Sequence, residues 1–426
     1  MIQEFNSISK VQGELELPGD KSISHRALFF SSMAEGESRI YNLSNSDDVK
    51  STQECFEALG VKIIIENDDF IVTGKGYNNF DAPIKPLYAG NSATTARLLT
   101  GLLMTQKFQS LVTGDYSLSK RPMGRVIEPL TRMGARISAS ENETLPLTVR
   151  SAKEIKPATY ELPVASAQVK SSILIAGLHL DEETSVVEKF QSRNHTEKML
   201  GLKVERNGNG IISYSSKKNY PEAKEYSVPA DVSTAAFFIV LTLLSQNSSL
   251  TLKNVSLNET RTGYLKILKE MGGYIKIDNK QEKAGEEYGD IFVKSSELKN
   301  IKISEDIIPN IIDEVPILAI AGIFAEGDFE INNISELRSK ETDRIKAICE
   351  NLKLVGLDID EKEAGFMISG ELGNNKVEFE SYDDHRIAMT FAVLSMLLEN
   401  GSKVNGFDCV KISNPGFLRQ LRKVTI

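Results

Sequence analysis

Acidic and basic residues crowd together in the segment Leu337–Arg344, where they could bind anions and move protons. Lys340, Glu341, Asp343 and Arg344 place two cations and two carboxylates within five consecutive positions. If the segment is helical, residues i and i+4 share a face, so Lys340 and Arg344 point the same way with Glu341 beside Lys340. A solvated helix laced with ion pairs would have the same pattern. A chemical role is favoured because similar clusters recur along the chain.

The other clusters stand in short polar turns ahead of apolar segments, or in basic loops. A helix start offers unpaired N–H groups and a positive dipole end, which suit anions. Ser22 could instead be only a helix cap. We predict a site for one or more anionic groups, with Asp313 and Glu341 as its acid/base candidates. Its cations are Lys21, Arg26, Arg121, Lys340, Arg344, Arg386 and Lys411.

Composition narrows the classes of function. A net charge of −9 disfavours nucleic acid as a partner. The three cysteines and four histidines form neither a disulfide framework nor a zinc motif. No glycine-rich nucleotide-binding pattern is present, so no cofactor is predicted. We expect a cytoplasmic protein without membrane association, because the chain starts without an export signal and its apolar runs are about half the ~20 residues that span a bilayer.

Six similar units cover the chain. Each opens with a polar turn ahead of an apolar helix, and the turns recur at intervals of 65 to 82 residues, at Asp20, Asn91, Ser166, Asp231, Asp313 and Asp383. In most units a strand, a charged amphipathic helix and a Gly turn into another strand follow. This alternation predicts the α/β class. The first helix of each unit is apolar nearly all round, so we expect it to be buried at a domain centre.

Three units to a domain give two domains. We expect residues 20–228 to form the first, and residues 1–19 with 229–426 to form the second. Two polar stretches, Asn207–Tyr226 and Asn279–Asp290, are predicted to be turn-rich and weakly packed. The first of them lies midway along the chain and is the natural boundary.

Several motifs together resemble the 5-enolpyruvylshikimate-3-phosphate synthase family over essentially the full chain. The resemblance implies two domains, each of three βαβαββ repeats with buried helices, in an inside-out α/β barrel. It implies transfer of a carboxyvinyl group from phosphoenolpyruvate to the 5-hydroxyl of shikimate 3-phosphate, on the route to chorismate and aromatic amino acids. It implies a monomer without metal or cofactor. The motifs are residues 17–26, 90–97, 120–123, 340–344 and 383–386.

The resemblance also implies roles for single residues. Asp313 corresponds to the base for the 5-hydroxyl proton, and Glu341 with Lys21 to the acid/base pair at the methylene carbon. The first domain becomes the shikimate 3-phosphate half, and the second supplies the catalytic carboxylates and the phosphoenolpyruvate cations. The shikimate 3-phosphate contacts are Lys21, Ser22, Arg26, Ser166, Gln168, Asp313 and Lys340. The phosphoenolpyruvate contacts are Lys21, Arg121, Gln168, Arg344, Arg386 and Lys411.

The chain departs from the family's most familiar pattern at several substrate-binding positions. Ala93 replaces a Gly beside the phosphoenolpyruvate site, Ala167 replaces a serine, and His195 replaces a tyrosine. The segments 166–170, 193–197 and 258–261 instead resemble the glyphosate-tolerant subgroup, so we expect tolerance.

Two alternatives remain. A UDP-N-acetylglucosamine enolpyruvyl transferase would share the repeats, but that family usually has a Cys before its basic Arg-Pro motif, and residues 112–121 contain none. A polyanion-binding repeat scaffold would need a broad basic face, which the acidic composition disfavours.

Overall fold

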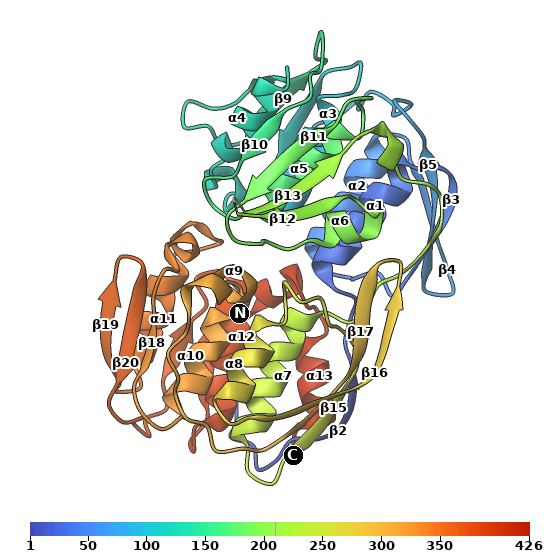
Figure 1. The fold of residues 1–426 in the computed structure, drawn as a ribbon. Helices are drawn as coiled ribbons and strands as arrows, with labels where there is room; N and C mark the ends of the chain where they lie inside the picture. The colour runs from blue at the N-terminus through green and yellow to red at the C-terminus, as the bar shows by residue number, and fades with distance from the viewer. Residues whose placement is uncertain (209) are drawn as a thin grey trace. The chain divides into compact units, whose positions relative to one another are not determined.

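The computed structural model describes residues 1–208 and 210–426, and the chain divides into two compact units (Figure 1). Unit 1 comprises Met1–Pro18, Ala230–Gln281 and Glu287–Ile426, and unit 2 comprises Gly19–Pro229 and Glu282–Glu286. The described residues form six separate sheets of three or four strands. The predicted α/β class with three repeats in each half is confirmed. In the described part of the chain, no helix is both long and apolar enough to cross a membrane.

Unit 2 holds the first three repeats. The second runs β6 (Leu87–Tyr88), α3 (Ala93–Leu103), β7 (Ser110–Thr113), α4 (Gly124–Arg132), β8 (Arg136–Ser138) and β9 (Leu147–Arg150). The third repeats this order in β10 (Thr159–Glu161), α5 (Ala167–Gly177), β11 (Thr184–Glu188), α6 (His195–Leu200), β12 (Val204–Asn207) and β13 (Gly210–Ser215). In both sheets the first two strands are parallel and the others antiparallel.

The first repeat is closed by a strand from the end of unit 2. It consists of α1 (Lys21–Met33), β3 (Glu35–Tyr41), α2 (Asp47–Ala58), β4 (Lys62–Glu66) and β5 (Asp69–Lys75). Strand β14 (Glu225–Ser227) pairs in parallel with β3 and so fills the place of the missing first strand.

Unit 1 holds the last three repeats and borrows two strands from the N-terminus. The fourth repeat is β2 (Gln12–Glu16), α7 (Val232–Leu244), β15 (Ser249–Ser256), α8 (Gly263–Glu270), β16 (Tyr274–Lys283) and β17 (Glu286–Lys294). The fifth is α9 (Ile308–Ile311), α10 (Val315–Ile323), β18 (Phe329–Ile331), α11 (Arg344–Lys353), β19 (Asp358–Lys362) and β20 (Gly365–Ser369). The sixth is β21 (Glu378–Glu380), α12 (His385–Leu397), β22 (Ser402–Asn405) and α13 (Phe417–Val424), with β1 (Gln3–Phe5) paired to β22.

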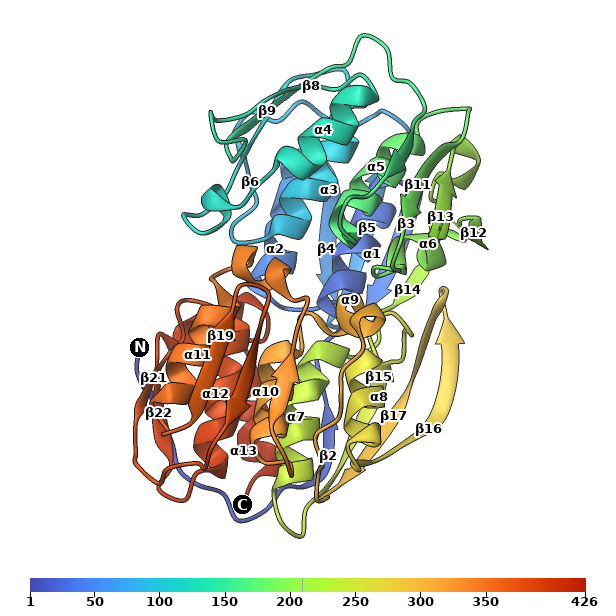
Figure 2. The ribbon, with the colours of Figure 1, turned by 60° about the vertical axis from the view of Figure 1, so that its left-hand side comes forward.

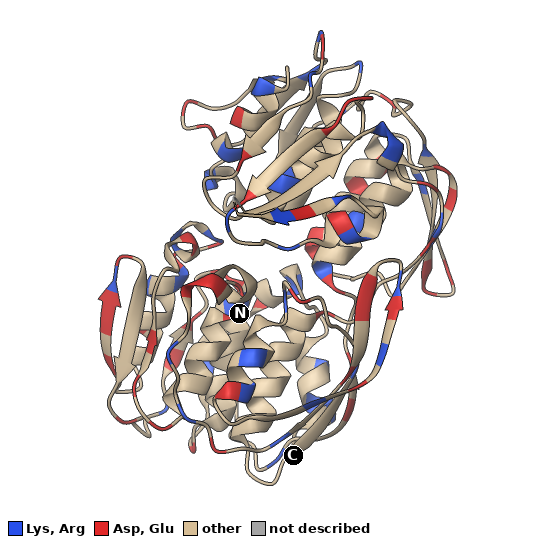
Figure 3. Ribbon diagram, in the orientation of Figure 1, with Lys and Arg blue, Asp and Glu red and all other residues tan. Residues whose placement is uncertain are grey.

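The six apolar helices form the cores of the two units, as predicted. In unit 2, α3 packs against α1 and α5, and in unit 1, α7, α10 and α12 pack against one another (Figure 2). Helices α7 and α10 carry no charge, which Figure 3 shows as uninterrupted tan. The packing is close: a Cβ built on Gly101 of α3 would lie 2.2 Å from the carbonyl oxygen of Ser172 in α5.

Polar residues concentrate at the starts of these helices because a buried helix still has unpaired N–H groups in its first turn. Five of the six are capped by a side chain, from Asp20, Ser92, Ser166, Asp231 and Asp384. Ser22 is therefore not the cap of α1. The exception is α10, where Glu314 occupies the cap position without bonding the helix. Its carboxylate is turned to other partners.

Three expectations about local structure are wrong. Residues 340–343 are not helical: a 3₁₀ turn, Ser335–Ser339, precedes them, and α11 begins at Arg344 with Asp343 as its cap. Asp is a better cap than helix-interior residue, which explains the break. The stretch Asn207–Tyr226, of which Asn209 lies outside the described residues, contains β13. The stretch Asn279–Asp290 belongs to the hairpin of β16 and β17.

A buried ion cluster fixes α6 against α5 in unit 2. Lys170 Nζ lies 2.6 Å from Glu188 Oε2 and 2.7 Å from Glu197 Oε1. Burial disfavours the lysine's charge, but Glu197 and Glu188 outweigh it and raise the pKa of Lys170. Ser192 and Ser213 hydrogen-bond the two carboxylates. The cluster thereby holds α6, which carries Thr196 to the candidate site.

Replacing this lysine should destabilise the protein strongly. We expect Lys170→Met to lower the free energy of unfolding by about 3–5 kcal/mol, because two buried carboxylates lose their cation. Urea unfolding measures the change. Lys203→Met is the control, since it removes an exposed pair with Glu205, 2.8 Å apart, and should leave stability unchanged. Equal effects of the two substitutions would contradict the assignment.

Candidate active site

Arg26, in the second turn of α1, is a buried guanidinium held by uncharged oxygen atoms. Its Nε donates to Thr196 Oγ1 at 2.8 Å, its Nη1 to the carbonyl of Ser22 at 2.9 Å, and its Nη2 to Ser171 Oγ at 2.8 Å. These bonds come from α6, α1 and α5. Together they fix the orientation of the guanidinium.

Lys21 and Ser22 occupy the first turn of α1, as the sequence predicts. Lys21 Nζ lies 2.7 Å from Asp48 Oδ2 in the first turn of α2, and Ser22 Oγ accepts a bond of 3.3 Å from Arg193. One turn on, burial lowers the pKa of His25 well below its ordinary value, and the charges of Lys21 and Arg26 act in the same direction. His25 is therefore neutral, and the positive charge of this helix start comes from the lysine and the arginines.

Arg121 is fixed over the start of α3. Its Nη2 donates to Asn91 Oδ1 at 2.7 Å and to Ser117 Oγ at 3.2 Å, while its Nη1 donates to the carbonyl of Asn91. Asn91 in turn donates to Asp115 at 2.8 Å. Ala93 is the first residue of α3, directly after this turn, and only 9% of it is exposed.

Gln168 joins the second and third repeats. Its Oε1 accepts a bond of 2.5 Å from Arg97, and its Nε2 donates to Thr94 Oγ1 at 2.9 Å. Ser166 caps α5 and Ala167 is the first residue of that helix. The predicted site residues of unit 2 thus lie in the first two turns of α1, α3 and α5 or at their caps, except Arg121, which lies in a loop that contacts the start of α3.

Arg344 is the centre of the candidate residues in unit 1. It is buried, and its Nε lies 2.7 Å from Asp384 Oδ2, its Nη2 2.7 Å from Glu341 Oε2 and its Nη1 3.2 Å from Asp313 Oδ1. Burial opposes the charge, but Asp384 and Glu341 outweigh it, so the pKa of Arg344 is raised. The two predicted catalytic carboxylates therefore share one guanidinium.

Two further cations surround Asp313. Lys340 Nζ lies 3.9 Å from Asp313 Oδ1 and 3.3 Å from Glu336 Oε1. Arg386 Nη2 lies 3.7 Å from Asp313 Oδ2, and its Nη1 donates to the carbonyl of Asp313 at 3.0 Å. Burial lowers the pKa of Arg386.

Sequence reasoning missed Asp48 and gave no role to Asp384 or Glu314. Asp384 caps α12 and pairs with Arg344, while Glu314 lies 3.4 Å from Arg386 Nη1 and 3.6 Å from Arg261 Nη2. The sequence signal for these residues is a carboxylate at a predicted helix start. An ordinary helix cap has the same signal, so the sequence does not distinguish the two roles. Lys411 lies exposed in the 3₁₀ turn Phe407–Ile412, and no described contact joins it to the other candidates.

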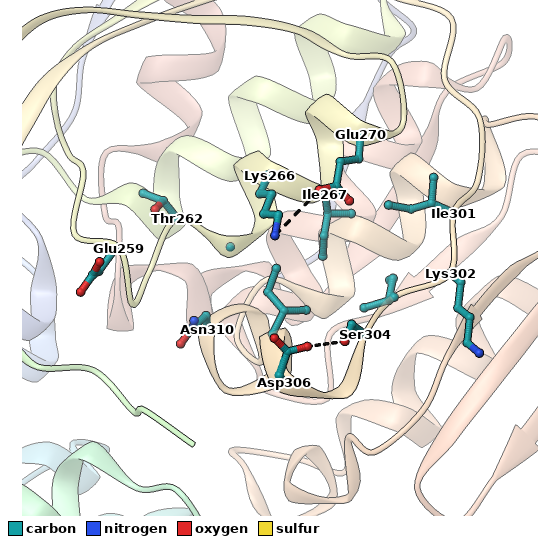
Figure 4. Close-up of a pocket in the computed structure, with 13 residues that line it drawn as sticks. Glu259, Thr262, Lys266, Ile267, Glu270, Ile301, Lys302, Ser304, Asp306 and Asn310 are labelled. Carbon is teal, nitrogen blue, oxygen red and sulfur yellow. Dashed lines mark hydrogen bonds and ion pairs between the residues drawn. The ribbon is translucent and has the colours of Figure 1, made fainter. Parts of the chain in front are cut away.

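Unit 1 also contains a cavity of about 290 Å³ (Figure 4). It is lined by α8 and residues 301–310, with Lys266, Glu270 and Asp306 among its charges. None of the predicted site residues lines it. Among residues 1–208 and 210–426, no group of three or more His, Cys, Asp and Glu side chains is placed to hold a metal ion.

Each unit therefore supplies a different chemical capacity. Unit 2 places Lys21 and Arg26 in the first two turns of α1 and Arg121 beside the start of α3, and cations near helix N-termini can bind phosphate or carboxylate groups. Unit 1 places the carboxylates of Asp313 and Glu341 against Arg344, and carboxylates among cations can serve in acid/base catalysis.

Comparison with known proteins agrees with this chemistry. The EPSP synthase (3-phosphoshikimate 1-carboxyvinyltransferase) family model matches residues 5–421. The 3-phosphoshikimate 1-carboxyvinyltransferase of Petrotoga mobilis is 47% identical over 99% of both chains. An EPSP synthase structure from Acinetobacter baumannii has a TM-score of 0.86 and 38% identity, covering 100% of this chain and 98% of that one.

A more distant structure shares the fold alone. The enolpyruvyl transferase NikO from Streptomyces tendae covers 100% of this chain and 97% of its own, with a TM-score of 0.79 at 13% identity. The family match along nearly the whole chain and the identity to the Petrotoga protein are far stronger. They show that the chain belongs to the EPSP synthase (3-phosphoshikimate 1-carboxyvinyltransferase) family.

Proposed function

We propose that the protein transfers the carboxyvinyl group of phosphoenolpyruvate to the 5-hydroxyl of shikimate 3-phosphate, as its family's name describes. The observation that carries the proposal is the placement of Asp313 and Glu341 on the same buried guanidinium, Arg344. The reaction joins two anionic substrates and moves protons at two positions. A set of cations with two carboxylates meets both needs.

Asp313 accepts the proton of the 5-hydroxyl group of shikimate 3-phosphate as the oxygen bonds to C2 of phosphoenolpyruvate. Glu341, with Lys21, gives a proton to the methylene carbon and removes one when the C2–O bond to phosphate breaks, so the vinyl group is restored. Phosphate leaves with the electron pair of that bond, and cations such as Arg344 and Arg386 stabilise its charge. Lys21, Arg121, Gln168, Arg344, Arg386 and Lys411 bind phosphoenolpyruvate.

Shikimate 3-phosphate is bound chiefly by the first domain. We assign residues 20–228 to this domain, and residues 1–19 with 229–426 to the domain that supplies the catalytic carboxylates and the phosphoenolpyruvate cations. Support comes from Arg26, a buried guanidinium in the second turn of α1 whose orientation is fixed by hydrogen bonds to Thr196, Ser22 and Ser171. The contacts are Lys21, Ser22, Arg26, Ser166, Gln168, Asp313 and Lys340, and Ala167 is a further substrate-binding position. We further propose a cytoplasmic monomer.

Phosphate release tests the function. We expect release from phosphoenolpyruvate only when shikimate 3-phosphate is added, without added metal and with a chelator present. UDP-N-acetylglucosamine is the matched acceptor control and should give no release. Turnover with the nucleotide sugar instead, or with neither acceptor, would overturn the proposed reaction.

Asp313→Asn should slow turnover by roughly 10²–10⁴-fold, because the amide keeps the shape of the side chain but accepts no proton. The KM for phosphoenolpyruvate should change far less than kcat. Asp306→Asn is the control, an exposed carboxylate of the same unit whose Oδ1 accepts a hydrogen bond from the Ser304 hydroxyl. A variant at Asp313 that keeps more than about a tenth of wild-type turnover would exclude the general-base role.

We also propose that the enzyme tolerates glyphosate because of Ala93. Its side chain stands at the first position of α3, next to the turn that holds Arg121. Glyphosate is longer than phosphoenolpyruvate, so a methyl group beside their shared pocket obstructs the inhibitor more than the substrate. One added methyl in a packed site costs about 1–3 kcal/mol.

Ala93→Gly should therefore increase sensitivity to glyphosate by roughly 5- to 150-fold, with little loss of turnover. Inhibition curves at fixed phosphoenolpyruvate measure the change. Ala58→Gly, at the exposed last position of α2, is the control for a glycine at a helix end. If the Ala93 variant is as tolerant as the wild type, the methyl group is not the cause.

A further inference from the structure

An ion pair closes a small ring around the turn that carries Lys340 and Glu341. Arg338 Nη1 lies 2.7 Å from Asp343 Oδ2, so the four residues 339–342 are held between the paired side chains. We propose that Arg338 is a positioning residue that sets the turn for catalysis. The inference deepens the proposed function and rests on the roles given there to Lys340 and Glu341.

Arg338 is anchored to a rigid part of the fold. Its Nε donates to the carbonyl of Glu363 at 2.8 Å and its Nη2 to the carbonyl of Lys362 at 2.7 Å. Its Nη1 also donates to Glu361 at 3.1 Å. All three acceptors lie at the tip of the β19–β20 hairpin. These bonds fix the orientation of the planar guanidinium. A lysine ammonium at this position would be held in one orientation less firmly.

Asp343 ties the other end of the ring to α11. Its Oδ1 accepts the backbone N–H of Lys346 at 3.1 Å and so caps the helix, while its Oδ2 receives Arg338. One carboxylate thus joins the hairpin to the helix that begins with Arg344. The side chains of Arg338 and Asp343 therefore link the hairpin to the helix directly, without the backbone of residues 339–342.

The turn has little regular structure of its own. Lys340 is extended, at φ −83° and ψ −154°, and residues 341–343 form no helix. Glu341 nevertheless lies 2.7 Å from Arg344, and Lys340 lies 3.9 Å from Asp313. The ring fixes both ends of this turn, beside the ion pairs that Lys340 and Glu341 make with Glu336 and Arg344.

The effect should appear in turnover more than in stability. The side chains of Arg338 and Asp343 are 29% and 32% exposed, and part-exposed ion pairs contribute little to folding. A displacement of about 1 Å in a catalytic group, by contrast, can cost on the order of 10²-fold in rate.

Two variants separate the ring from the helix cap. Arg338→Met removes the guanidinium, and Asp343→Ser keeps a capping oxygen but cannot reach Arg338. Each should lower kcat by about tenfold or more, with a melting temperature close to wild type. The double variant should be no slower than the slower single variant, because the two substitutions remove the same ion pair. Lys362→Met is the matched control: it breaks the Lys362–Glu330 pair of 2.7 Å on the same hairpin and should keep wild-type kcat.

Hydrogen exchange gives a readout that does not depend on the reaction. Amides 339–343 should exchange faster in Arg338→Met than in the wild type or in Lys362→Met, without substrate present. Wild-type kcat and unchanged exchange in Arg338→Met and Asp343→Ser would overturn the inference, as would losses that add in the double variant. An inactive wild type would instead overturn the proposed function, while the exchange result would still decide whether the ring holds the turn.

Discussion

A guanidinium withdrawn from water needs acceptors of matching charge, and Arg344 is where unit 1 meets this requirement. Its carboxylate partners come from the cap of α12, from the residue before Glu314 at the start of α10, and from the turn before α11. One side chain therefore fixes the relative positions of three helix starts. Any change that moves one of them leaves a buried charge short of a partner. The pairing that folding requires around Arg344 therefore also sets the positions of the candidate catalytic carboxylates.

In unit 2, the buried guanidinium of Arg26 donates hydrogen bonds to hydroxyl and carbonyl oxygens of three helices. The buried helices are mostly apolar beyond their first two turns, and their first turns are the places where polar groups are required anyway. The fold therefore concentrates its chemistry at helix starts, where capping and ligand binding use the same kinds of side chain.

Much of this could be read from the sequence, because five of the six turns combine a capping residue with the apolar helix that follows. The caps Asp20, Ser166 and Asp231 were visible in this way. The 340–344 run was misjudged as helical because its charge spacing fits a helix, whereas Asp343 starts one. Strand β13 was missed because its buried positions include Ser213 and Ser215, which hide the alternation. Lys170 could not be paired with Glu188 and Glu197, since tertiary contacts between elements leave no periodic trace.

The N-terminal strands can pair with their neighbours only late in synthesis. Strand β2 pairs with β15, where Thr251, opposite Glu14, follows it by 237 residues, and β1 pairs with β22 still later in the chain. At a ribosomal rate of about 5–20 residues per second, β2 waits roughly 12–50 s for its neighbour. The continuous segment of unit 2 emerges in that interval. The waiting strand, Gln12–Glu16, carries Glu14 and Glu16, and such charges discourage premature pairing with other chains.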